Sequence, residues 1–126
     1  MIGFVDTGID YRNRAFLDAN GESRILAVWD QTIQQGVAPQ VFYFGSEYGR
    51  EDINRALATE NPLEIVPVTD PLRHGTVMAG IAAGSIVGGG STYIGAAPEA
   101  DIVVVKLKEC KPYLREYYFL PESVPA

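Results

Sequence analysis

Short apolar runs alternate with polar, glycine- and proline-bearing segments along the chain. Three of these runs, residues 2–6, 25–29 and 101–107, are continuously apolar or rich in β-branched residues. Runs of this length and composition predict buried parallel strands. A further apolar run at residues 41–44 predicts a short strand of a hairpin or of a sheet edge.

Two longer segments have the apolar spacing of helices. Residues 50–59 place Ile53, Ala56 and Leu57 on one face of a predicted helix. Residues 74–84 predict a second helix, whose glycines suit close packing against a sheet. Strands that alternate with helices predict an α/β protein with a parallel sheet. The apolar face predicted for the second helix consists of Val77, Met78, Ile81 and Ala82.

Composition and charge narrow the class of protein. The 126 residues suit a single domain. A net charge of −6 with scattered Lys and Arg argues against nucleic-acid binding. No apolar stretch is long enough to span a bilayer, so no membrane partner is expected. With one His and one Cys, no transition-metal site is expected. The glycines at 88–90 lack the Lys-Ser or Lys-Thr of a phosphate-binding loop, and no cofactor is predicted.

Asp6 and His74 carry the candidate chemistry. Asp6 ends the first predicted strand within an Asp-Thr-Gly triplet, and His74 begins the second predicted helix within a His-Gly-Thr triplet. A carboxylate that orients an imidazole, and an imidazole that accepts a proton from a hydroxyl, are two members of a nucleophilic triad. His74 is the only histidine in the chain. Each triplet alone also fits a plain role, as a strand-to-loop turn or as a surface histidine at a helix start.

Three segments together resemble the subtilisin-like serine proteases, the subtilase family. They are FVDTGI at residues 4–9, HGTVMAGI at 74–81 and GAAP at 95–98, and they occur in the order typical of the family. Residues 23–32 and 60–67 look more specifically like the clostridial branch of that family. That branch includes proteases and pseudoproteases of spore germination.

The resemblance implies a fold, a reaction and two site residues. The implied fold is α/β, a partial parallel three-layer αβα sheet of the subtilisin type. Residues 1–126 would form the N-terminal part of the catalytic domain, with an insertion at about 20–70. Asp6 and His74 match the catalytic aspartate and histidine, but the Gly-Thr-Ser motif of the nucleophile is absent. We therefore expect a fragment of a serine endopeptidase that hydrolyses peptide bonds, inactive alone.

The resemblance also sets expectations about metals, partners and location. Ala15 stands where the archetype of the family has an aspartate that binds calcium, which argues against that calcium site. The expected partners are a peptide or protein substrate and the missing C-terminal part of the catalytic domain. The first apolar run begins at residue 2 with no signal segment before it, which favours a cytoplasmic or spore-associated location. An incomplete sheet exposes apolar faces and edges. Self-association is therefore expected, or cover by the aromatic residues of 108–126.

Two alternatives remain open at the level of sequence. A pseudoprotease, a non-catalytic subtilase relative that binds or regulates a partner, would share the same segments, although Asp6 and His74 are both retained. A retroviral-type aspartic protease also carries an apolar-apolar-Asp-Thr-Gly motif, and residues 93–95 imitate its later apolar-apolar-Gly. That fold is nearly all β, so the two predicted helices argue against it.

Overall fold

The computed structural model of the chain describes residues 1–85 and 94–109. The glycines at 88–90, Cys110 and the aromatic segment within 110–126 lie outside these residues, so the expectations about them stay predictions. Within the described part, no helix is long and apolar enough to cross a membrane.

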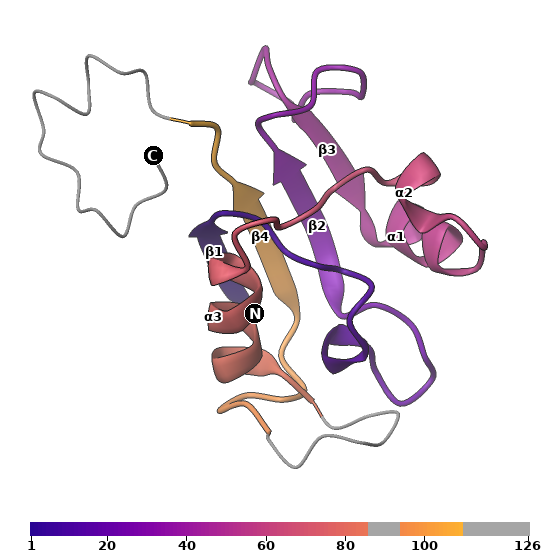
Figure 1. Cartoon of the computed structure of the whole chain (residues 1–126), viewed down its shortest axis with the longest axis vertical. Helices are drawn as coiled ribbons and strands as arrows, with labels where there is room; N and C mark the ends of the chain where they lie inside the picture. Colours follow the sequence, from indigo (N-terminus) through magenta and orange to yellow (C-terminus); the bar gives the residue numbers. More distant parts are fainter. Residues whose placement is uncertain (86–93, 110–126) are drawn as a thin grey trace, which may run out of the picture.

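One four-stranded sheet organises the described residues, with the strand order β1-β4-β2-β3 (Figure 1). β1 (Ile2–Asp6), β4 (Ile102–Lys106) and β2 (Ile25–Asp30) confirm the three strands predicted from apolar runs. They pair in parallel, with β4 between the other two. β3 (Ser46–Gly49) is antiparallel to β2 at one edge, which makes the sheet mixed and not purely parallel.

The strand predicted at residues 41–44 is wrong. The backbone turns there, with a φ of 74° at Val41, and the edge strand β3 begins only after Gly45. Two aromatic side chains of this segment, Phe42 and Phe44, pack on Trp29, and the segment does not pair through its backbone. The rings of Phe42 and Phe44 lie 4.4 and 5.2 Å from the ring of Trp29.

The helices supply the second layer. α1 (Arg50–Leu57) and α3 (His74–Ala83) confirm the two predicted helices, and the segment between them contains one short helix, α2 (Pro62–Ile65). A 3₁₀ turn, η1 (Arg14–Phe16), follows β1. Side chains from these elements and from one face of the sheet form a single core. The described residues thus contain the sheet and one helical layer of the expected αβα arrangement. The core residues are Ile9, Tyr11, Phe16, Ile25, Val28, Ile53, Ala56, Val66, Val68, Ala79, Ala83, Ile102 and Val104.

The buried face of α3 is not the one that the sequence pattern predicts. Its small residues Gly75, Ala79 and Ala83 are buried, and this narrow face lets the helix lie close to β1 (Figure 1). The predicted face points outward: Val77 is 55% exposed and Ile81 is 65% exposed. The helix is apolar on all sides, so its periodicity could not identify the face that packs on the sheet.

A buried arginine joins the elements at the C-terminal end of α3. Arg24, only 6% exposed, donates hydrogen bonds to the carbonyl oxygens of Ala100 and Ala15 at 2.8 and 2.7 Å. It also donates to the carbonyls of Leu17 and Ala83. Burial lowers the pKa of Arg24 below its ordinary value. One guanidinium therefore connects the loop after β1, the end of α3 and the segment before β4.

Replacing Arg24 should destabilise the fold markedly. Arg24→Met keeps a long apolar side chain but removes the guanidinium donor from the carbonyl oxygens of Ala83 and Ala100, and each loss costs about 1–3 kcal/mol. We expect the free energy of unfolding to fall by about 3 kcal/mol in urea titrations. Arg12→Met is the matched control, because Arg12 is exposed and its side chain pairs with the equally exposed carboxylate of Asp10. An equal loss in both variants would contradict the role of Arg24.

Tyr11 should make stability fall at high pH. Its ring is fully buried, its hydroxyl donates to the Val66 carbonyl at 2.7 Å, and burial raises the pKa of Tyr11 from 10.0 to about 12. Because the folded pKa is above the unfolded one, the stabilisation is complete below pH 10 and is lost as the pH rises towards 12. Unfolding curves from about pH 9 to about pH 11 should show this loss, and Tyr11→Phe should remove most of it.

Candidate active site

Asp6 and His74 lie in direct contact at the carboxyl end of β1. Nδ1 of His74 is 2.8 Å from Oδ1 and 3.0 Å from Oδ2 of Asp6. Oδ1 of Asp6 also accepts the backbone N–H of Thr7 at 2.7 Å, which holds the carboxylate in place. The side chain of Asp6 is 17% exposed and that of His74 is 58% exposed. The structure thus brings together the two residues that the sequence singles out.

A close approach of two backbones makes this contact possible. A Cβ on Gly75, in the first turn of α3, would overlap the carbonyl oxygen of Gly8, just after β1. Gly8 itself has a φ of +128°, and a Cβ there would lie 2.6 Å from the carbonyl oxygen of Thr69. Only glycine suits such positions without strain. The glycines of the two triplets therefore allow the helix start to rest on the end of the strand.

A buried carboxylate that the sequence analysis did not single out supports the pair. Asp70 is 8% exposed and lies four residues before His74 in the sequence. Its Oδ1 accepts the hydroxyl of Thr7 at 2.7 Å, and its Oδ2 accepts the hydroxyl and the backbone N–H of Thr76 at 2.7 and 2.8 Å. The N-cap position of α3 is Arg73, so Asp70 lies outside the position where a capping Asp is expected, and no local sequence signal identifies it.

Hydrogen bonds keep Asp70 ionised. Burial raises the pKa of Asp70, but the bonds from Thr76, Thr7 and the Arg73 backbone outweigh it, so the pKa lies below its ordinary value. At neutral pH a fixed negative charge thus lies at the N-terminal end of α3, where the partial positive charge of the helix dipole is favourable for it.

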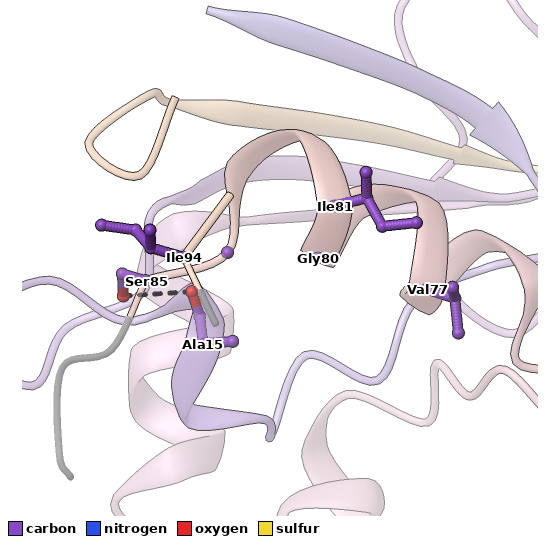
Figure 2. Close-up of a pocket in the computed structure, with 7 residues that line it drawn as sticks. Ala15, Val77, Gly80, Ile81, Ser85 and Ile94 are labelled. Carbon is purple, nitrogen blue, oxygen red and sulfur yellow. Dashed lines mark hydrogen bonds between the residues drawn. The ribbon is translucent and has the colours of Figure 1, made fainter. Parts of the chain in front are cut away.

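The described residues place no serine hydroxyl in contact with His74. Ser85 lies at the opposite end of α3, and its hydroxyl donates to the Ala15 carbonyl at 3.2 Å (Figure 2). An open pocket of about 370 Å³ lies beside it, lined by apolar side chains of α3 such as Val77 and Ile81 together with Ile94 (Figure 2). Ser85 therefore has a structural role at the helix end.

Among residues 1–85 and 94–109, no group of three or more His, Cys, Asp or Glu side chains is placed to hold a metal ion. Ala15, at the position that the resemblance links to calcium, contributes its carbonyl oxygen to hydrogen bonds from Arg24 and Ser85. The carbonyl oxygen of Ala15 therefore acts as a structural hydrogen-bond acceptor.

Comparison with known proteins identifies the family. The family model described as "Subtilase family" matches residues 1–117. The chain belongs to the subtilase family. A solved structure described as the Clostridium perfringens CspB protease is 38% identical and superposes with a TM-score of 0.69 over 85% of this chain. The match covers 20% of that clostridial protease, so this chain spans about one fifth of its length.

These findings confirm the family, the clostridial likeness and the α/β fold of the subtilisin type. No curated protein sequence matches the chain significantly. The alternative of a retroviral-type aspartic protease is wrong, because the chain is a subtilase with helices α1 and α3 in its core.

Two glycines of α3 should respond in opposite ways to the same substitution. Gly75→Ala adds a methyl group that would overlap the carbonyl oxygen of Gly8. It should therefore push α3 away from the end of β1 and lower the free energy of unfolding by about 2 kcal/mol or more. Gly80→Ala places a methyl group with no atom within 4 Å, and should raise stability by about 1 kcal/mol through helix propensity. Thermal unfolding measures both. Destabilisation of equal size would show that the close approach at Gly75 does not matter.

Proposed function

We propose that this subtilase chain supplies the aspartate and the histidine of an Asp-His-Ser triad that hydrolyses peptide bonds. The observation that carries the proposal is the 2.8 Å contact between Nδ1 of His74 and Oδ1 of Asp6. Asp6 accepts a hydrogen bond from Nδ1–H and so selects the tautomer whose other ring nitrogen, Nε2, is an acceptor. The exposed imidazole then has its basic nitrogen available to a hydroxyl.

In the proposed reaction His74 acts first as a base and then as an acid. It removes the proton of a serine hydroxyl as that oxygen attacks the carbonyl carbon of a peptide. It then gives the proton to the leaving amine, and water releases the acyl group in the reverse sequence of proton transfers. Asp6 stays ionised and stabilises the imidazolium that forms between these steps.

We propose that the serine comes from the remainder of a catalytic domain, of which residues 1–126 are the N-terminal part, with the insertion at about 20–70. The length of the chain, one fifth of the clostridial protease that it matches, supports this. The outward apolar face of α3, with Val77, Met78 and Ile81 exposed, also supports it, because exposed apolar patches mark surfaces that bind other polypeptide. Without that serine the chain alone is inactive, since triad members act as a unit.

Complementation tests the proposed function. The chain is mixed with the C-terminal part of the catalytic domain of the clostridial protease, and the complex is isolated by size-exclusion chromatography. The complex should cleave peptides and react with a serine-directed phosphonate, whereas the chain alone should do neither. Asp6→Asn and His74→Ala should each lower kcat/KM by about 10⁴-fold. Glu64→Gln, an exposed position on α2, is the matched control for loss of a charge.

The same experiment separates an enzyme from a pseudoprotease. A folded complex that neither cleaves peptides nor reacts with the phosphonate would contradict the proposed hydrolysis. It would then favour a regulatory role for the same surface. Cleavage that persists in His74→Ala would show that the reaction does not depend on the proposed base.

A further inference from the structure

The hydrogen bond between Asp6 and His74 is not sufficient to fix the relative position of the two side chains. The imidazole is more than half exposed, and ion pairs or hydrogen bonds that face water contribute little to rigidity. The relative position of the two side chains therefore depends on the backbone around them. Two backbone stretches matter here: the turn after Asp6 and the first turn of α3.

Asp70 forms hydrogen bonds with residues of both stretches. Its Oδ1 accepts a hydrogen bond from the hydroxyl of Thr7, the residue after Asp6. The Thr7 oxygen in turn accepts a hydrogen bond from the N–H of Gly75, the residue after His74, at 2.9 Å. Because the Thr7 hydroxyl donates its hydrogen bond to Asp70, a lone pair of the Thr7 oxygen is left to face the N–H of Gly75. One chain of hydrogen bonds thus connects the neighbours of both members of the pair.

A second connection runs through the other oxygen of the same carboxylate. Oδ2 of Asp70 accepts both the N–H and the hydroxyl of Thr76, and the Thr76 oxygen accepts the N–H of Asp10 at 2.9 Å. The loop that follows β1 is therefore joined to α3 at two points. Both connections include the buried carboxylate of Asp70.

Asp70 also holds the turn that delivers His74 to the helix start. Arg73 has a φ of 64°, an unfavourable conformation for a residue other than glycine. Its N–H donates to Oδ1 and to the backbone carbonyl of Asp70, each at 3.1 Å. Strained residues of this kind persist where their surroundings hold them, and they are common at functional sites.

Only a carboxylate satisfies all of these donors. Each oxygen of Asp70 accepts one threonine hydroxyl and one backbone N–H, so an amide NH₂ group on either side would face a donor. We propose that Asp70 is a positioning residue that, through Thr7 and Thr76, sets the tautomer and orientation of His74 against Asp6. This inference rests on the proposed function of that pair.

The tautomer of His74 tests the proposal, because it reports on the contact with Asp6 and does not require catalysis. His74 is the only histidine, so ¹⁵N-histidine labelling of the whole chain gives one imidazole spectrum. At about pH 9, where histidine is neutral, the ¹⁵N shifts give the ratio of the Nδ1–H to the Nε2–H form. Wild type should be mainly Nδ1–H, and Asp6→Asn should reverse this and set the scale.

Asp70→Asn and Thr7→Val should each lower the Nδ1–H to Nε2–H ratio by about threefold to tenfold, the factor that loss of one hydrogen bond gives. Thr7→Ser retains the hydroxyl and should keep the wild-type ratio, as should Glu64→Gln, which removes an exposed charge. Amide spectra establish that each variant is folded. Thr7→Val keeps the charge of Asp70, so it carries the test if Asp70→Asn does not fold.

The opposing results are distinct. An unchanged ratio in folded Asp70→Asn, or in folded Thr7→Val, would overturn the positioning role while the pair itself remains. A shift of equal size in Glu64→Gln would also overturn it, because a remote charge would then have the same effect. A wild-type ratio that favours Nε2–H would show instead that Asp6 does not hold the ring, and the proposed function would fail.

Discussion

The contact between the start of α3 and the end of β1 is the constraint on which the rest of the site depends. Gly75 touches the Gly8 carbonyl so closely that a methyl group cannot fit between them. At this distance the side chains that flank the contact, Asp6 and His74, are within hydrogen-bonding reach of one another. A strand end and a helix start that are far apart in sequence thus become one rigid unit, because backbone packing leaves little freedom.

The fold secures α3 at both ends with charges of opposite sign. Asp70 accepts hydrogen bonds from the N–H and the hydroxyl of Thr76 in the first turn, and Arg24 donates a hydrogen bond to the Ala83 carbonyl at the last turn. These signs match the helix dipole, which is positive at the N-terminus and negative at the C-terminus. Residues 95–97 donate further N–H groups to the last carbonyls of the helix. The helix that carries His74 is therefore fixed along its axis as well as against the sheet.

The sequence predicted the elements that depend on local pattern and missed those that depend on tertiary contact. β1, β2, β4, α1 and α3 follow from apolar runs and spacing, and Asp6 and His74 follow from the two triplets. The prediction of a strand at residues 41–44 failed because packing of Phe42 and Phe44 on Trp29 outweighs the β propensity of the segment. The role of Asp70 was not predicted, because its partners Thr7 and Thr76 come together only in the fold.

The described residues contain a nearly self-sufficient arrangement for the two proposed triad members, Asp6 and His74. The hydrogen bonds of Thr7, Gly75 and Asp70 around the pair lie between residues 6 and 76, and backbone pairing with β4 holds the strand that carries Asp6. The apolar face of α3 points away from this arrangement, towards space that none of the described residues fill. Orientation of the base and supply of a nucleophile are thus separate problems in this family. Hydrogen bonds within the described residues serve the first, and the proposed function assigns the second to the remainder of the catalytic domain.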